Sequence, residues 1–238
     1  VKGFWRQLEN FLLPRIRKSY TVSQSIADYY NNKYQMDMGV VRNVPNLEKE
    51  IKTNEAQFPT NHKTVLYQGV LNPGRGLKPM IKALHFLEEV DLVIIGYGKV
   101  ELELIQFVKD EMLENRVHFM GRIPHEELPN FTKLADIGMV LEEPLGKSFG
   151  YSLPNKLFDY IHAELPIVCG VLPEIQKVVE TYKVGVVVTD YEPKTIADAI
   201  EILLNDTRKY KEIQQNQQKA KEDFNWEKEQ KLLDTYFN

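Results

Sequence analysis

The stretch YQGVLNPGRGLKPMIKAL, residues 67–84, joins an apolar run, a glycine-rich turn and an amphipathic helix in direct succession. In the turn, Arg75 stands between Gly74 and Gly76. The stretch therefore predicts a strand–turn–helix unit. Its turn is either a plain connection with a solvated arginine, or a site where a helix N-terminus and Arg75 hold an anion. The helix has an apolar stripe at helical spacing, formed by Leu77, Met80, Ile81, Leu84 and Leu87.

The same alternation continues from Thr64 onward. Short, nearly all-apolar runs are typical of parallel strands that are covered on both faces. Strict alternation with helices predicts right-handed βαβ units. We therefore expect an α/β fold, a Rossmann-like doubly wound parallel sheet with helices on both faces. After the first strand at 64–70, strands are expected at 91–96, 116–121, 136–142, 166–170 and 184–189, and helical segments from about Pro193 to the end.

The first 63 residues follow a different pattern. Residues 1–13 predict a helix that Pro14 ends, followed by a short strand at 20–22 and a helix that Ser23 can cap. Another short strand is expected within 38–46, and the polar residues 47–63 are typical of a linker. Because the chain begins without Met and enters a helix at once, we expect a fragment of a longer protein.

Composition excludes several classes of protein. The chain has 238 residues, a net charge of −4 and 43% hydrophobic residues, which gives no bulk reason to expect a nucleic-acid partner. A single cysteine, Cys169, excludes an internal disulfide and is expected to be a small core residue. The five histidines lack metal-ligand spacing, so no metal site is predicted. No signal peptide and no run near the ~20 apolar residues of a membrane span is visible.

Ligands of doubly wound sheets bind beyond the carboxyl ends of the strands, so the loops at 69–76, 96–99, 121–124, 142–154 and 170–173 are candidates. No P-loop, dinucleotide fingerprint or nucleophile elbow occurs among them. The loop after 142 is the most informative, because it carries Gly146 and Gly150 and enters a helix at Pro154. Such a loop over a helix N-terminus suits a diphosphate.

Charged residues follow in that helix. Lys156 adds positive charge for a diphosphate, and Asp159 can accept hydrogen bonds from ribose hydroxyls. The alternative is a Lys–Asp pair on a surface helix. For Glu142 and Glu143 we expect a capping or solvated role rather than general-acid catalysis.

Two further loops contain glycines next to a larger side chain. Residues 121–124, GRIP, could present backbone groups to a nucleobase edge, and residues 96–98, GYG, could allow close approach of a ligand. Both loops are equally compatible with plain strand-to-helix turns.

Five segments in this order, YQGVLNPGRGL, DLVIIGYG, VHFMGRIPHEEL, ADIGMVL and LPNKLFDYIHAELPIVCG, resemble the retaining, family 4 glycosyltransferases of the GT-B fold. The resemblance covers residues 64–238. It implies that 64–223 form the nucleotide-sugar donor-binding domain and that 224–238 form a closing crossover helix. Residues 1–46 resemble the end of the N-terminal acceptor domain, and 47–63 the linker.

The resemblance also implies roles for single residues. Two basic residues commonly hold the diphosphate in the family: Val70 stands where the first, an arginine, is common, and Arg75 stands near the second, usually a lysine. Pro154-Asn155-Lys156 fits a subset of the family, and we expect Arg75 and Lys156 to be the catalytic residues. Asp159 matches a carboxylate that binds ribose, and the family's other carboxylate falls on Tyr151. Ile123 matches the position that meets the base. The donor-binding set is Gly74, Gly76, Gly96, Tyr97, Gly98, Arg122, Ile123, Gly150, Tyr151, Ser152, Leu153, Pro154, Asn155 and Asp159.

The implied activity is transfer of a sugar, with retention, from a nucleotide-diphosphate sugar to a glycan or lipid-linked acceptor. It implies no cofactor and no metal. We expect the fragment to bind the donor but to be inactive without its N-terminal domain. The resemblance further implies polysaccharide or lipid-linked glycan assembly in the cytoplasm, and peripheral association of the full-length protein with the inner membrane face.

Two alternatives remain. Tyr151 and Val70 favour a catalytically degenerate module that binds a nucleotide or a protein partner. A sugar-nucleotide 2-epimerase shares the architecture, but the segment LPNKLFDY, 153–160, argues against it because it matches the transferase loop.

Overall fold

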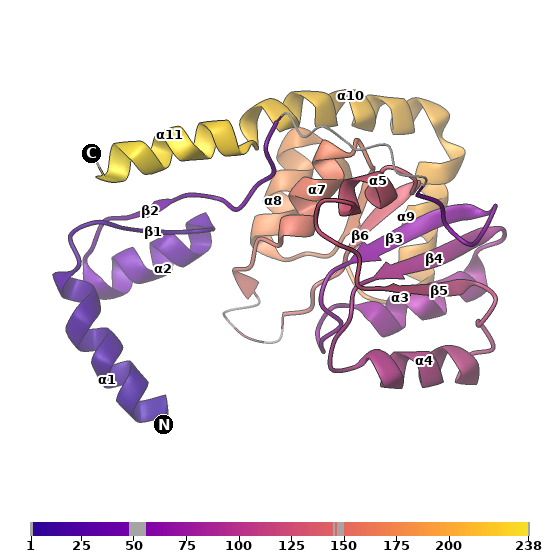
Figure 1. Cartoon of the computed structure of the whole chain (residues 1–238), viewed down its shortest axis with the longest axis horizontal. Helices are drawn as coiled ribbons and strands as arrows, with labels where there is room; N and C mark the ends of the chain where they lie inside the picture. Colours follow the sequence, from indigo (N-terminus) through magenta and orange to yellow (C-terminus); the bar gives the residue numbers. More distant parts are fainter. Residues whose placement is uncertain (1, 48–55, 145, 147–149, 238) are drawn as a thin grey trace.

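The computed structural model of the chain describes residues 2–47, 56–144, 146 and 150–237. Its centre is a six-stranded parallel sheet with the order β5-β4-β3-β6-β7-β8 (Figure 1). The strands are β3 (Lys63–Gln68), β4 (Val90–Ile95), β5 (Val117–Gly121), β6 (Ile137–Val140), β7 (Ile167–Cys169) and β8 (Gly185–Val187). The order runs outward in both directions from β3 and β6. The predicted doubly wound parallel sheet is therefore confirmed.

Helices cover both faces of this sheet because its strand side chains alternate between two hydrophobic clusters. One cluster contains Val65 and Tyr67 of β3 and the apolar stripes of α3, α4 and α9. The other contains Leu66 of β3 and the buried faces of α7, α8 and α10. These helices are α3 (Leu77–Ala83), α4 (Glu101–Asp110), α7 (Asn155–His162), α8 (Pro173–Tyr182), α9 (Pro193–Asn205) and α10 (Thr207–Asp223), and a short α5 (Leu128–Thr132) follows β5.

The first helix of the sheet unit is shorter than its apolar stripe suggested. α3 ends at Ala83, and a 3-10 turn at Leu84–Phe86 follows. Leu87 lies beyond both in an extended conformation, yet it is buried in the same cluster. The chain must turn here to enter β4, so the stripe marked residues that are buried rather than the length of the helix.

A second, smaller sheet lies apart from the first, on the far side of α7 and α8 in the view of Figure 1. It consists of β1 (Ser19–Thr21) and β2 (Met38–Val40), which are parallel, joined by α2 (Gln24–Tyr34) and preceded by α1 (Lys2–Leu12) and a 3-10 turn at Leu13–Arg15. The last helix, α11 (Trp226–Phe237), returns from α10 to this sheet. The Arg42 guanidinium lies 3.0 Å from the Glu229 carboxylate, so an ion pair connects the segment after β2 to α11.

Ser23 departs from the prediction that it caps α2. It occupies the N-cap position, but its side chain makes no capping hydrogen bond. Its Oγ instead donates to the carbonyl of Tyr151 at 2.8 Å, because Ser23 is buried against that loop. The boundaries at 46, 63 and 223 stay predictions, and residues 48–55 of the expected linker lie outside the described residues.

Candidate functional site

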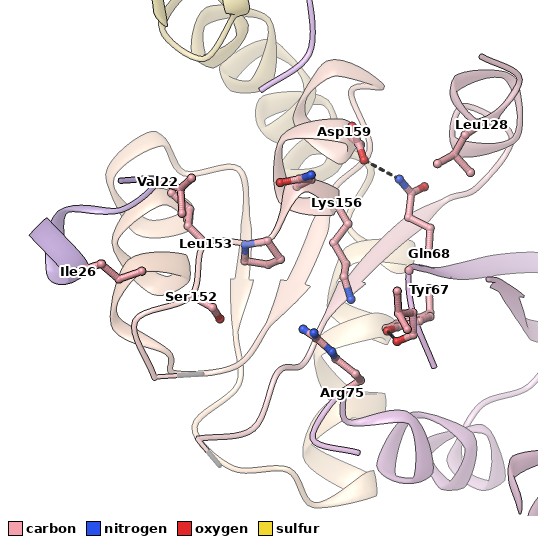
Figure 2. A pocket seen from close by; sticks show the side chains of 14 residues that line it. Val22, Ile26, Tyr67, Gln68, Arg75, Leu128, Ser152, Leu153, Lys156 and Asp159 are labelled. Atoms are coloured by element: carbon pink, nitrogen blue, oxygen red, sulfur yellow. Dashed lines mark hydrogen bonds between the residues drawn. The ribbon is translucent and has the colours of Figure 1, made fainter. Parts of the chain in front are cut away.

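A cavity of about 450 Å³ opens at the carboxyl ends of β3 and β6, where the strand order reverses. Seven of the predicted site residues line it: Arg75, Ser152, Leu153, Pro154, Asn155, Lys156 and Asp159. Figure 2 shows their side chains around one space, together with Tyr67, Gln68 and Leu128. Val22 and Ile26 from the N-terminal part close one side. The cavity therefore lies between the large sheet and the N-terminal part.

Arg75 and Lys156 approach the centre of this cavity from opposite sides (Figure 2). Both contact the same oxygen of Glu142: Lys156 Nζ lies 2.8 Å from Oε1, and Arg75 Nη1 donates to Oε1 at 3.3 Å. Glu142 is fully buried, so the expectation of a capping or solvated role is wrong for this residue. The reason is its place just after β6, a central strand covered on both faces.

The burial of the two cations argues against one of the alternatives raised by the sequence at each position, and anion binding stays a prediction. The Arg75 side chain is only 25% exposed, so it is not a solvated arginine of a plain turn. The Lys156 side chain is 7% exposed, and its Nζ lies 3.9 Å from the centroid of the Tyr67 ring. A solvated Lys–Asp pair on a surface helix is therefore wrong. A buried ammonium over an aromatic face is held where it can meet an anion.

Asp159 belongs to a hydrogen-bonded chain that the sequence reasoning missed. Gln68 Nε2 donates to Asp159 Oδ2 at 2.9 Å, and Thr132 Oγ1 donates to Gln68 Oε1 at 2.8 Å. Gln68 is buried at the end of β3. A polar residue that closes an apolar strand was the available signal, because a buried amide needs partners. Gln68 orients the Asp159 carboxylate at the rim of the cavity.

A second cavity of about 290 Å³ adjoins the first and shares Gln68, Gly69, Val70 and Leu128 with it. It extends over the ends of β4 and β5, where four predicted residues line it: Gly96, Tyr97, Arg122 and Ile123. The Arg122 guanidinium lies 5.6 Å from the centroid of the Tyr97 ring. An aromatic ring and a planar cation side by side offer flat surfaces on which a planar heterocycle could stack.

Four of the predicted glycines, Gly74, Gly76, Gly98 and Gly150, line neither of these cavities. Gly74 and Gly76 lie, with Arg75, around a separate cavity of about 220 Å³. A Cβ on Gly76 would lie 2.3 Å from the Leu141 carbonyl oxygen, and its φ of +66° also favours glycine. A Cβ on Gly98 would lie 2.2 Å from the Leu71 carbonyl oxygen. The sheet unit needs small residues at Gly76 and Gly98 whether or not a ligand binds.

The loop at 142–154 is only partly described, because residues 145 and 147–149 lie outside the described residues. Gly150 and Tyr151 are described and do not line the cavity. The Tyr151 ring lies 6.5 Å from the ring of Tyr29, and its carbonyl accepts the Ser23 hydrogen bond. This residue thus contacts the N-terminal part of the chain.

Other groups have structural roles. Cys169 is fully buried in the core as expected, and burial raises the pKa of its thiol well above the ordinary value. Within the described ranges, no three His, Cys, Asp or Glu side chains come together as a metal site would require. Nor does any described helix combine the length and apolar character needed to cross a bilayer.

Comparison with solved structures gives many matches, three of which illustrate the range. The chain superposes on sucrose-phosphate synthase from Thermosynechococcus elongatus with a TM-score of 0.75 and 18% identity, over 97% of this chain and 61% of that one. For HepE of Anabaena, solved in complex with UDP-glucose, the TM-score is 0.76 and the identity 20%, over 96% of this chain and 66% of that one. For a glycosyltransferase of Rickettsia africae the TM-score is 0.73 and the identity 13%, over 99% of this chain and 67% of that one.

At these identities the similarity shows the shared GT-B glycosyltransferase fold, and the chain spans about two thirds or less of the first relatives' length. No curated protein matches the chain significantly in sequence. The family described as glycosyl transferases group 1 matches residues 48–220, which is well over half of the chain. The chain therefore belongs to the group 1 glycosyl transferases.

Proposed function

We propose that this chain binds a nucleotide-diphosphate sugar, and that the protein transfers the sugar to a glycan or lipid-linked acceptor with retention of configuration. The observation that carries the proposal is the convergence of Arg75 and Lys156 on one cavity at the carboxyl edge of the sheet. Two cations that face one space, next to the first turn of a helix, make a site for a diphosphate.

The contribution of these residues to transfer is electrostatic. As the bond between sugar and diphosphate breaks, negative charge grows on the leaving diphosphate. Arg75, Lys156 and the first N–H groups of α7 stabilise that charge, because they are already oriented in a partly buried site. Charge compensation by side chains leads us to expect transfer without a divalent metal, so a chelator should leave the rate unchanged.

The remaining parts of the cleft suit the rest of the donor. Asp159, oriented by Gln68, accepts hydrogen bonds from ribose hydroxyls at the rim of the first cavity. The base stacks in the second cavity near Tyr97 and Arg122, which Ile123 also lines. Because HepE was solved with UDP-glucose, UDP-linked hexoses are the first donors to test.

Titration calorimetry with UDP and GDP tests donor binding directly. We expect one of the two to bind and UMP, which lacks the second phosphate, to bind more weakly. A folded chain that binds neither nucleoside diphosphate would rule out the nucleotide-sugar function. For the transfer step, donor hydrolysis and transfer are measured on the full-length protein, at the cytoplasmic membrane face where we propose that the acceptor is supplied.

The second candidate is a nucleotide- or protein-binding module without catalysis. Two observations favour it: Tyr151 contacts the N-terminal part instead of lining the donor cavity, and Val70 lines the cavity at a position that is 51% exposed. This candidate predicts nucleotide binding but neither hydrolysis nor transfer by the full-length protein. Turnover of any nucleotide sugar would exclude it.

A further inference from the structure

The two cations of the donor cavity already have an anion beneath them. Glu142 Oε1 contacts Lys156 Nζ at 2.8 Å and Arg75 Nη1 at 3.3 Å. The other oxygen of the same carboxylate, Oε2, is buried and has no hydrogen-bond partner among the described residues. Glu142 thus contacts the two residues that the proposed function assigns to the diphosphate. Its second oxygen accepts no hydrogen bond from the described residues.

The backbone around Glu142 is held in place on both sides. Burial, together with the charges of Glu143 and Glu142, raises the pKa of Tyr191 to about 12, so its hydroxyl stays protonated. That hydroxyl donates to the Glu142 carbonyl at 2.6 Å. The next residue, Glu143, donates its N–H to the Gly74 carbonyl at 2.9 Å. A carboxylate anchored in this way stays under the cations when a ligand enters.

An incoming phosphate must therefore share Arg75 and Lys156 with Glu142. The approach is open, because both cations line the cavity, whereas Glu142 does not. Glu142 has opposite effects on the empty and the occupied site. In the empty site it offsets the repulsion between the buried Lys156 ammonium and the partly buried Arg75 guanidinium. In the occupied site it repels the diphosphate at short range.

We propose that Glu142 is a positioning residue that holds Arg75 and Lys156 in the cavity before the donor arrives and competes with the diphosphate for them. The inference rests on the proposed function and deepens it. Glu142 limits the affinity for nucleoside diphosphates, and so promotes release of the diphosphate that is left after transfer.

The test is the variant Glu142→Gln, which keeps the shape and removes the charge. We expect its dissociation constant for UDP, or for GDP if that is the nucleotide bound, to fall about tenfold. Affinity should also decrease more steeply with added salt, because the site carries one more net positive charge. At the same time the melting temperature of the empty protein should fall. A purely structural glutamate would give lower stability without tighter binding.

The matched control is Glu143→Gln. Glu143 is the adjacent residue, is partly buried and forms no ion pair within the described part of the chain. Its substitution removes the same formal charge but leaves the cations paired, so affinity for the nucleotide should not change. An equal gain in both variants would overturn the inference, because the effect would then come from net charge alone.

A pair of variants covers the case in which Glu142→Gln does not fold. Lys156→Gln is compared with Glu142→Gln/Lys156→Gln, in which both buried charges are removed together. The double variant should bind the nucleotide several-fold more tightly than the single one.

If the wild-type protein binds UDP or GDP and removal of the Glu142 charge tightens binding in neither background, the inference fails while the proposed function stands. Failure of the wild-type protein to bind UDP, GDP or inorganic pyrophosphate would overturn both.

Discussion

At each end of the large parallel sheet, a buried carboxylate contacts basic side chains and forms a small charged cluster with them. The two clusters differ in their surroundings. At the carboxyl end, Glu142 contacts Arg75 and Lys156 beside a cavity. At the amino end, Asp91 lies near the start of β4. His62 Nδ1 lies 3.0 Å from its Oδ1, and His118 Nε2 lies 2.8 Å from its Oδ2.

The difference concerns hydrogen bonding. Both oxygens of Asp91 have partners, whereas Oε2 of Glu142 has none among the described residues. Burial raises the pKa of the Asp91 carboxyl, but hydrogen bonds from His118, Thr60 and His62 outweigh it and the pKa lies below its ordinary value. A buried carboxylate whose two oxygens both have hydrogen-bond partners stabilises the fold. A buried carboxylate with one unpartnered oxygen, next to a cavity, belongs to a site that is suited to a ligand.

The largest effect is expected for Lys156→Gln. It should weaken binding of the nucleoside diphosphate about 100-fold, because a buried charge-assisted contact is lost. Calorimetry measures the change. The control is Lys78→Gln, which removes an exposed lysine that pairs with Glu103 and should leave affinity unchanged. Equal losses in both variants would mean that the cavity has no special role.

Asp91→Asn probes the amino end. We expect a decrease of about 2 kcal/mol in the free energy of unfolding, because partly buried basic groups lose their shared carboxylate. Urea unfolding measures it, with the exposed pair partner Asp198→Asn as a near-neutral control. Affinity of the folded variant for the nucleotide should equal that of the wild type. Weaker binding would contradict the view that the Asp91 cluster contributes only to stability and the Glu142 cluster to the ligand site.

Arg75→Ala should have a smaller effect on the ligand than Lys156→Gln, about tenfold weaker binding, because the Arg75 side chain is more exposed. The fold should stay intact, as a melting curve would show. Arg208→Ala, on the exposed surface of α10, serves as the control. Unchanged affinity in Arg75→Ala would show that the glycine-rich turn only connects β3 to α3 and does not hold the diphosphate.

The smallest effect concerns pH. Because the folded-state pKa of Asp91 is lowered, its contribution to stability is complete above the ordinary carboxyl pKa of about 3.8 and is lost as the pH falls through the folded-state value. The difference in unfolding free energy between wild type and Asp91→Asn should therefore narrow in acid. A difference that stays constant from neutral pH into this range would show that the charge of Asp91 contributes nothing.

Much of the fold could be read from local pattern. Apolar strands alternating with amphipathic helices predicted the doubly wound sheet, because covering a parallel sheet on both faces requires that pattern. The same pattern identified the loops at the carboxyl edge. Seven predicted residues line the cavity of about 450 Å³, and four others line the adjoining one. The roles assigned to these residues stay predictions until a ligand is measured.

The errors arose where a residue's surroundings come from distant parts of the chain. Ser23 looked like a helix cap, but it donates to Tyr151, which is 128 positions away. Gln68 was assigned no role from the sequence, although its Nε2 donates to Asp159, which is 91 positions away. Local propensity carries no information about such partners, since a polar side chain takes whichever partner burial leaves available.

By itself, the sequence determined the class of fold, the edge of the sheet at which the cavity opens and half of the residues that line it, because these follow from short-range periodicity and from the direction of parallel strands. Only the tertiary structure decided that Glu142 lies between Arg75 and Lys156. The physical reason is the strand order: β3 and β6 are neighbours, so the loops that leave them meet, and charges 67 and 14 positions apart share one buried space.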